Sequence, residues 1–490
     1  MKKRMLIALA LVLLISAVPP ISFAEEATTL RVLTTYTDVD RATDPSRAWV
    51  EEATGYTVVY DTLPASNPYD QLNLMFVSGD VDYDYVLIGA DALAKNIFYT
   101  FAANGLLTDL TDMLPQYENI MNFDERLLNT LAIDGRIYAI CSSALALTNP
   151  NNMVRYDWLE ACGLEAPTNR QEFYEMLVAF KETDPDGLGA NLIPFSCTAT
   201  DMVATISATF GILYDYEVRD GAIIDTRLTP EYKEYLTFMH QLFSEGLLDP
   251  DFAVNTSLTL DEKVAAGRVG YYAGWVDTAS NYLQALWDAG IEDKGMFAIE
   301  PLQDDEGRQR LRSGHNGQGL SQIGFIPASS DKAAEVLDFI NKFHDPETFV
   351  WLIHGEEGVD YEVVDGERRP LDAFSERRNN MHAFFLVQDG EAYFDLWQLR
   401  TRKNPAYDAV ARTIFETAEG HIEWPVMGFS PAFGEVSTQI TMVQEYAVQE
   451  ATKFIAGARS LDEFDQFVEE MIARGANEIL DAYNAWYQNQ

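Results

Sequence analysis

The sequence predicts an α/β protein made of two large lobes. At 490 residues the chain is too long for a single hydrophobic core. Apolar residues make up 47% of it and aromatic residues 12%, so it can bury a large apolar surface and is not expected to be disordered. Short runs of β-branched and aromatic residues alternate with helical segments, which is typical of sheets with parallel strands.

The first part of the chain shows this alternation most clearly. We expect strands over 30–36, 56–60 and 83–88, separated by helices over 45–54 and 69–78. Gly55 and Gly79 follow the two helices and are typical helix stops. The turn from Gly89 to Asp91 ends the third strand.

The same pattern continues along the rest of the chain. We expect strands over 137–144, 270–274 and 323–327, and helices over 172–181 and 331–343. The last of these helices places Leu337 and Ile340 near one apolar face. The polar, glycine-bearing stretch 303–322 is the best candidate for a linker.

The first 24 residues predict a secretory signal peptide. Three basic residues (2–4) precede an apolar run (5–18), and the small residues Ser22 and Ala24 occupy the positions that a signal peptidase recognises. The apolar run is short for a membrane span, so an uncleaved anchor is the weaker alternative. We therefore expect a secreted protein.

The cysteines give no sign of a lipid anchor. Cys141, Cys162 and Cys197 all lie far from residue 25, where a lipid-anchored protein would carry a modified cysteine. Three cysteines in a secreted protein leave at least one thiol unpaired. We interpret all three as core residues, and one disulfide among them stays open.

The charge of the chain excludes one large class of partners. Its formal net charge is −43, and cleavage after Ala24 removes three cations and takes the charge to −46. A surface this acidic repels nucleic acid and anionic lipid. We therefore expect no nucleic-acid partner.

Residues 134–189 carry the most specific pattern of the chain. This stretch contains Asp134-Gly-Arg-Ile-Tyr138, Arg155-Tyr-Asp-Trp-Leu159, the helix start Pro167-Thr168 and the turn Asp184-Pro-Asp-Gly187. Further signatures are Glu245-Gly-Leu-Leu-Asp-Pro-Asp251, Ala266-Gly-Arg-Val-Gly270 and Gly355-Glu-Glu-Gly-Val-Asp-Tyr361. Together they resemble the extracellular solute-binding proteins (family 1) of ATP-binding cassette (ABC) importers, in the branch that carries sugars and oligosaccharides.

The resemblance implies a class II periplasmic-binding-protein-like fold. Two α/β lobes would be joined by hinge crossings near 138–145, 303–322 and 365–380, with the ligand cleft between them. After the signal peptide (1–24), the first lobe would comprise 25–141 and 311–370. The second lobe would comprise 142–310 and the helical segment 371–490.

The expected binding residues follow from where such a cleft lies. Ligands of α/β lobes bind at the carboxyl ends of parallel strands. A sugar needs aromatic faces for its ring and planar polar groups for its hydroxyls. The candidates at strand ends are Tyr36, Asp38 and Asp91, to which the family pattern adds Trp275 and Asp277, with Trp424 as a further candidate. Ordinary core packing is the alternative role for each aromatic residue.

The turn that starts at Asp184 is a degenerate version of a calcium loop. In relatives this loop often binds calcium, which needs several oxygen ligands at alternating positions. Asp184 and Asp186 are present, but Leu188 stands where a third oxygen ligand is expected. We therefore expect neither a metal ion nor a cofactor, and interpret the segment as a Pro-Asp-Gly turn.

Motifs of the common enzyme classes are missing from the sequence. It has no phosphate loop, no zinc-protease motif and no nucleophile elbow, and its six histidines are scattered. We expect a monomeric, non-catalytic binding protein that passes a carbohydrate to ABC permease subunits. The alternatives are a binding protein for a peptide or another polar solute, a secreted carbohydrate-active enzyme, and a receptor that signals to a membrane sensor.

Overall fold

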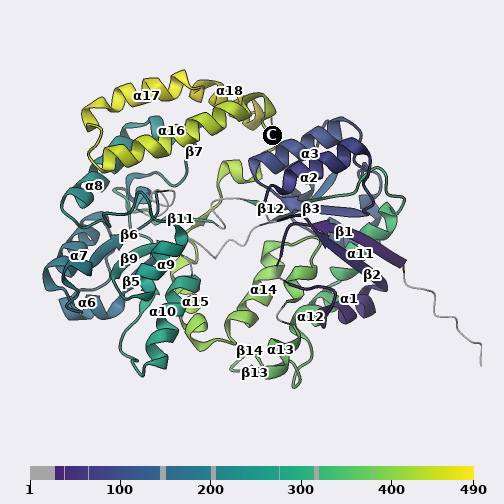
Figure 1. The fold of residues 1–490 in the computed structure, drawn as a ribbon, viewed down its shortest axis with the longest axis horizontal. Helices are drawn as coiled ribbons and strands as arrows, with labels where there is room; N and C mark the ends of the chain where they lie inside the picture. The colour runs from purple at the N-terminus through teal and green to yellow at the C-terminus, as the bar shows by residue number, and fades with distance from the viewer. Residues whose placement is uncertain are drawn as a thin grey trace, which may run out of the picture.

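The chain folds into two α/β lobes that lie side by side (Figure 1). The computed structural model describes residues 28–489 except for 38, 65, 144–150, 200–205, 275, 314–318 and 379. Each lobe is built around its own β-sheet. In the described part of the chain, none of the helices has the length and apolar character that a membrane crossing requires.

The first lobe contains a five-stranded sheet in the order β2-β1-β3-β12-β4. Strand β1 pairs in parallel with β2 and β3, whereas β12 runs antiparallel to β3 and β4. The strands are β1 (Thr28–Thr34), β2 (Tyr56–Thr62), β3 (Tyr85–Gly89), β4 (Ala139–Ser143) and β12 (Leu320–Phe325). The strands expected over 30–36, 56–60 and 83–88 correspond to β1, β2 and β3.

Helices cover both faces of this sheet because its strands are apolar on both sides. Leu33, Val86 and Ile88 face one helix layer, while Leu30 and Val32 face the other. The helices of this lobe are α1 (Ser46–Thr54), α2 (Pro68–Ser78), α3 (Ala92–Ala103), α4 (Glu118–Met121), α5 (Glu125–Asn129), α11 (Ala333–Phe343), α12 (Pro346–His354), α13 (Asp372–Arg377) and α14 (Gly390–Thr401). Such two-sided burial is typical of parallel sheets.

The second lobe contains a four-stranded sheet in the order β10-β5-β9-β6. Its strands are β5 (Asn151–Arg155), β6 (Ile193–Ser196), β9 (Val269–Gly274) and β10 (Met296–Ala298). One face packs on α6 (Tyr156–Cys162), α7 (Arg170–Thr183) and α8 (Pro230–Ser244), and the other on α9 (Ser257–Ala265), α10 (Val276–Asp288) and α15 (Pro405–Ala418). All three cysteines are free thiols in this structure, so no disulfide links them.

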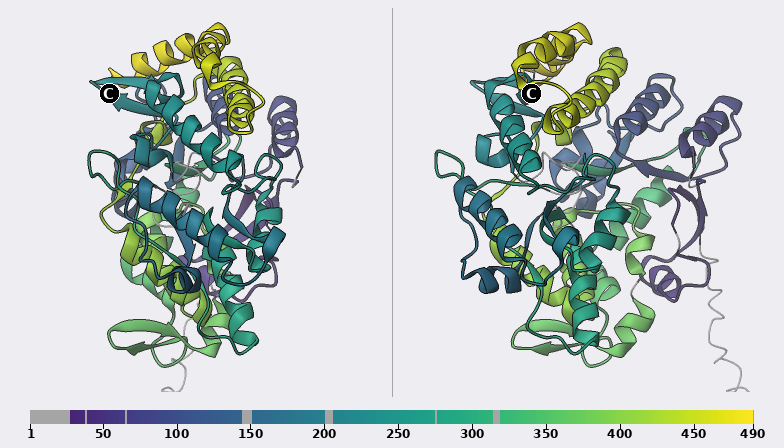
Figure 2. Two further views of the ribbon diagram at one scale, coloured as in Figure 1. Left: turned by 90° about the vertical axis from the view of Figure 1, so that its left-hand side faces the viewer. Right: turned by 60° about the vertical axis from the view of Figure 1, so that its left-hand side comes forward.

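Three C-terminal helices complete the second lobe. They are α16 (Ser437–Ile455), α17 (Phe464–Ala473) and α18 (Ala476–Tyr487), and they lie together at one end of the lobe in every view (Figures 1 and 2). Val443, Phe454 and Phe467 of these helices join the same apolar core as Tyr232 and Leu236 of α8. Two hairpins lie outside the sheets: β7 (Tyr216–Arg219) with β8 (Ala222–Asp225), and β13 (Tyr361–Val364) with β14 (Glu367–Pro370).

One segment packs differently from the expected division into lobes. We expected residues 371–490 in the second lobe, but Phe374, Phe385 and Leu399 belong to the core of the first sheet. The ring of Phe385 lies 5.4 Å from that of Phe343 on α11. The apolar run 383–387 is buried against this core. The last crossing of the chain into the second lobe therefore lies between α14 and α15.

A short parallel pair of strands lies along the path between the lobes. Strand β11 (Leu311–Arg312) pairs with β15 (Ile422–Glu423), which brings together segments that are far apart in the sequence. Ser313 follows β11, and its backbone N–H donates to the hydroxyl of Tyr214, at 2.9 Å. The expected linker 303–322 therefore includes an ordered strand.

Candidate functional site

In the first lobe the strand ends that face the other lobe are those predicted from the sequence. Strand β4 ends at Ser143, and from there the chain crosses to β5 of the second lobe. The register pairs Ser143 with Leu320 and Gly89 with Gln322. Gly89 at the end of β3 therefore lies on the side of the sheet where the chain leaves the lobe.

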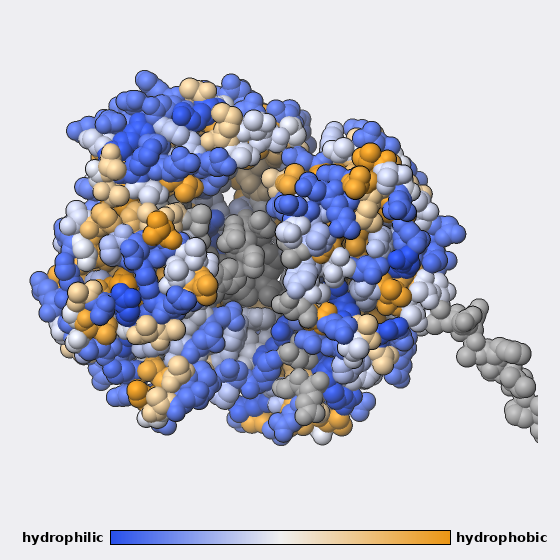
Figure 3. Space-filling view, in the orientation of Figure 1, coloured by the Kyte–Doolittle hydropathy of each residue, from blue (hydrophilic) through white to orange (hydrophobic). Residues whose placement is uncertain are grey.

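In the second lobe the register of the strands gives the same orientation. Strand β5 starts at Asn151, directly after the crossing, and Asn151 pairs with Gly274 at the end of β9. Strand β6 runs parallel to β9, so its carboxyl end at Ser196 lies on this side as well. The carboxyl ends of strands from both sheets therefore converge on the space between the lobes, where Figure 3 shows the surface hollowed.

Asp91 lies at this rim but its carboxylate serves mainly to start a helix. It is the N-cap of α3 and accepts hydrogen bonds from the backbone N–H groups of Leu93 (2.9 Å) and Ala94 (3.0 Å). The hydroxyl of Tyr69 donates to its other oxygen at 2.8 Å. Burial, with this hydrogen bond, raises the pKa of Tyr69. Tyr69 was not among the predicted site residues.

Tyr36 follows β1 and presents its side chain to solvent, with 56% of it exposed. Arg41, which lies in the loop after β1, ties this loop to the end of β1 and to Ala383. The Arg41 guanidinium donates to Thr34 Oγ1 at 2.8 Å and to the carbonyl of Ala383 at 2.6 Å. The loop position of Tyr36 is thus fixed while its ring stays accessible.

Asp277 lies in the first turn of α10, at the facing rim of the second lobe. Its side chain is exposed, yet the surrounding protein raises its pKa by desolvation, helped by the negative charge of Asp261. The positive charge of Arg400 acts against this rise. Arg400 belongs to α14 of the first lobe, so the Asp277 carboxylate lies within electrostatic reach of side chains from both lobes.

Trp424 directly follows β15 and lies in an aromatic pair. Its ring meets that of Phe429 edge to face, with the ring centroids 5.5 Å apart. The guanidinium of Arg126, from α5 of the first lobe, lies 4.0 Å from the Phe429 ring and 5.9 Å from the Trp424 ring. A Cβ at Gly319 would lie 2.4 Å from the Phe429 ring, so only glycine fits there. This aromatic pair therefore lies between segments of both lobes.

Lys95 fixes the segment that follows this pair. It is buried on α3, and its ammonium donates to the carbonyl of Ser430 at 2.8 Å. Burial lowers its pKa to about 8. Lys95, Arg126 and Phe429 could not be found from the sequence because their partners lie hundreds of residues away along the chain.

The six predicted residues thus have different positions. Tyr36, Asp91 and Asp277 lie at the converging strand ends, and Trp424 lies beside the paired strands β11 and β15. Asp38 and Trp275 fall outside the described residues. Among the residues that the structure describes, no group of three His, Cys, Asp or Glu side chains is arranged to hold a metal ion.

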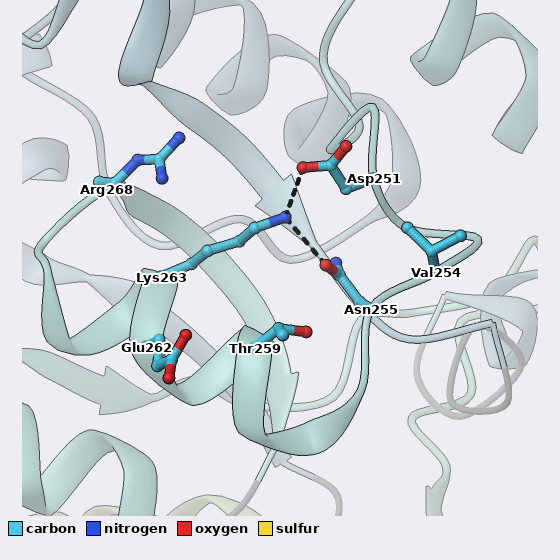
Figure 4. Close-up of a pocket in the computed structure, with 7 residues that line it drawn as sticks. All are labelled: Asp251, Val254, Asn255, Thr259, Glu262, Lys263 and Arg268. Atoms are coloured by element: carbon cyan, nitrogen blue, oxygen red, sulfur yellow. Dashed lines mark hydrogen bonds and ion pairs between the residues drawn. The ribbon is translucent and has the colours of Figure 1, made fainter.

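A polar pocket on the second lobe contains a lysine whose ammonium is paired within the protein (Figure 4). It encloses about 440 Å³ between α9 and the segment around Asp251. The Lys263 ammonium donates to Asp249 and Asn255, both at 2.8 Å, and to Asp251 at 3.1 Å. Because all donors of this ammonium are used, we assign the pocket a structural role.

Comparison with known proteins gives the same fold and a family. Residues 37–348 match the family model of the bacterial extracellular solute-binding protein. Lipoprotein LipO of Bacillus subtilis (strain 168) is 27% identical over 467 residues, which covers 91% of this chain and 89% of LipO. The polygalacturonan/rhamnogalacturonan-binding protein YtcQ of the same bacterium is 22% identical over 445 residues, covering 89% of this chain and 86% of YtcQ.

A solved structure shows the same arrangement. The HMO-binding, ABC-transporter-associated solute-binding protein of Bifidobacterium longum infantis ATCC 15697 superposes with a TM-score of 0.71. The superposition covers 94% of this chain and 98% of that one at 18% sequence identity, which confirms the predicted two-lobed α/β fold. Because the family model covers more than half of its length, this chain belongs to the bacterial extracellular solute-binding protein family.

Proposed function

We propose that the protein binds an oligosaccharide between its two lobes and delivers it to the permease of an ABC importer. YtcQ is a polygalacturonan/rhamnogalacturonan-binding protein and the structurally similar Bifidobacterium protein binds HMO, which supports a saccharide as the ligand. In this role the protein would act as a secreted monomer. It changes no covalent bond of its ligand.

The observation that carries this proposal is the composition of the converging rims. An aromatic pair at Trp424 lies between the lobes, an exposed Tyr36 follows β1, and a carboxylate at Asp277 faces them from the second lobe. Flat apolar faces and planar oxygen acceptors are the two kinds of group that a sugar ring with hydroxyls requires. Asp38 and Trp275 complete the proposed set, while Asp91 lies at the rim as the N-cap of α3.

Closure of the lobes gives the proposed mechanism. A ligand shifts the open–closed equilibrium only through contacts that differ between the two states, so it has to contact both lobes. The Asp277 rim and the Tyr36 rim belong to different lobes and would approach each other on closure. Selectivity follows because a wrong sugar would leave buried polar groups of the cleft unpaired.

Thermal unfolding of the mature protein, from Glu25, tests the proposal. Melting temperatures would be measured with mono- and oligosaccharides, including polygalacturonan and rhamnogalacturonan fragments, and with peptides as controls. A ligand at about 100 times its dissociation constant adds roughly 2.7 kcal/mol of stability. A shift with one saccharide series, with the saccharide recovered intact, supports the proposal. A shift with peptides alone, or shortened saccharide, contradicts it.

A matched pair of variants locates the binding surface. Tyr36 and Tyr156 are both exposed, by 56% and 59%, but Tyr156 lies on α6 at the outer side of the second lobe (Figure 1). Stacking on a sugar ring contributes roughly 1 kcal/mol, so Tyr36→Ala should weaken the affinity about fivefold to tenfold. Tyr156→Ala should leave it unchanged. Equal affinities of the two variants would place the ligand away from Tyr36.

A further inference from the structure

The loop that follows α7 in the second lobe is closed by groups of the protein itself. Asp184 ends the helix in the left-handed conformation (φ 46°), and its two carboxylate oxygens accept from the backbone N–H groups of Leu188 (2.7 Å) and Gly189 (2.8 Å). Its backbone carbonyl accepts from Gly187 at 2.9 Å. The turn is therefore formed by local hydrogen bonds.

The second carboxylate of the loop, Asp186, is surrounded by cationic and N–H donors. Arg155 Nη2 donates to Asp186 Oδ2 at 2.7 Å and Trp158 Nε1 donates to the same oxygen at 2.9 Å. The Lys294 ammonium donates to the other oxygen, Oδ1. Burial alone would raise the pKa of Asp186, but these hydrogen bonds outweigh it and lower the pKa to about 2.

The two cations are themselves held firmly in place. The Arg155 side chain is fully buried, donates to Asp157 and to the carbonyl of Gly267 (3.1 Å), and lies 4.7 Å from the Trp158 ring. Lys294 precedes Gly295, whose carbonyl accepts from the N–H of Tyr156 at 3.1 Å. The backbone around Lys294 is thereby tied to the residues that follow Arg155.

This arrangement does not fit the calcium ion that the family resemblance implies for this loop. Both oxygens of Asp186 already accept hydrogen bonds from positively charged side chains. Leu188 and Leu192 stand where oxygen ligands would be needed, and both pack against the apolar core of the second lobe. A divalent cation would have to displace the Lys294 ammonium and would be repelled by Arg155.

We propose that Lys294 and Arg155 act as a built-in cation at this loop, so that the second lobe keeps its structure without calcium. The ammonium of Lys294 occupies the side of Asp186 that an ion would otherwise bind. The loop then joins β5, α6, α7 and the segment before β10 through a fixed set of ion pairs. The inference concerns the stability of the lobe and is independent of the ligand in the cleft.

The first test compares melting temperatures of the full mature protein in excess EDTA and in excess calcium chloride, without sugar. The proposal predicts the same melting temperature in both, and no heat of calcium binding by calorimetry at this loop. A melting temperature that rises with calcium and falls with EDTA would overturn it.

The second test removes the cation. Lys294→Gln should lower the melting temperature by about 2–4 °C in EDTA and in calcium alike, whereas Lys294→Arg should keep most of the stability. Lys342→Gln is the matched control, because Lys342 forms an exposed ion pair with Asp338 (2.7 Å) at the surface of the first lobe. If Lys294→Gln melts at the same temperature as this control, the Lys294 part of the proposal is wrong.

A third variant tests whether the ammonium takes the position of the ion. Lys294→Glu replaces the ammonium beside Asp186 with a carboxylate, so its melting temperature should rise with calcium while that of the wild type does not. An equal response of both proteins to calcium would contradict the proposal. If the glutamate variant fails to fold, the melting temperature of Lys294→Gln relative to Lys342→Gln still tests whether the Lys294 ammonium stabilises the loop.

Discussion

The loop 184–191 and the rim of the cleft both carry aspartates, but the aspartate of the loop is paired within the protein and that of the rim is exposed. In the loop, Asp186 accepts from Arg155, Trp158 and Lys294, and its pKa is lowered to about 2. At the rim, Asp277 is exposed, desolvation raises its pKa, and no other described side chain is seen to donate to its carboxylate. An aspartate whose oxygens accept from several internal donors holds the fold, whereas one that accepts from no described side chain is available to a ligand.

Asp91 shows that position at the rim is not sufficient. It follows a cleft strand as Asp277 does, but its oxygens accept from two backbone N–H groups and from Tyr69. With 77 acidic residues in the chain, the number of internal donors separates these roles better than the location along the sequence. Changes at the three positions should therefore have different effects on stability, which we order from the largest to the smallest.

Removal of Asp186 should have the largest effect. Asp186→Ala leaves the buried guanidinium of Arg155 with Asp157 as its one remaining carboxylate partner. Because the buried charge of Arg155 is then compensated by one carboxylate instead of two, the free energy of unfolding should fall by about 2–3 kcal/mol in urea titrations. The control is Asp112→Ala, which removes an exposed partner of Arg136 and should cost less than about 0.5 kcal/mol. Equal losses would remove the distinction between the loop and the surface.

The pH dependence of stability should show the same ion pairs. The pKa of Asp186 in the folded protein, about 2, lies below the ordinary value of 3.8. The stability that its ionised form contributes is fully present above 3.8 and is lost as the pH falls through about 2. This contribution amounts to about 2 kcal/mol.

The measurement compares urea unfolding of the wild type and of Asp186→Asn across this acidic range. The two proteins should differ most near neutral pH and converge as the pH approaches 2. A difference that stays constant with pH would show that ionisation of Asp186 does not stabilise the fold.

Removal of the helix cap at Asp91 should have a smaller effect. Asp91→Ala deletes the acceptor for two N–H groups at the start of α3 and should lower the free energy of unfolding by about 1 kcal/mol. Asp91→Asn should retain most of the stability, because asparagine caps a helix about as well. If the asparagine variant is as unstable as the alanine variant, the charge of Asp91, and not its cap, stabilises the helix.

Substitution of Asp277 should affect stability least and binding most. Asp277→Asn removes a charge that the fold disfavours, so unfolding near neutral pH should be unchanged or slightly harder. The variant loses a charged hydrogen-bond acceptor at the rim, so the affinity for the saccharide found by thermal shift should fall about tenfold. A large loss of stability without a change in affinity would assign Asp277 to the fold.

Much of the fold could be predicted because its signals are local. The apolar runs at 30–36, 56–60 and 83–88 become strands, and the periodic helix expected at 331–343 is α11 (Ala333–Phe343). Within the segment 371–490, only the part up to the end of α14 packs in the other lobe than expected, because helical periodicity shows that a face is apolar, not which core buries it. The run 383–387 could have signalled a buried segment, but either lobe would have satisfied it.

The sequence by itself determined the α/β class and the family, and it suggested candidate binding residues, because composition, periodicity and motif spacing are properties of neighbouring residues. Only the tertiary structure decided which of those residues are committed to the fold. Lys294 meets Asp186 and Arg126 meets Phe429 across long stretches of chain. Whether a charged side chain pairs within the protein or can bind a ligand depends on which groups the folded chain places beside it. Those neighbours are set by the packing of the lobes.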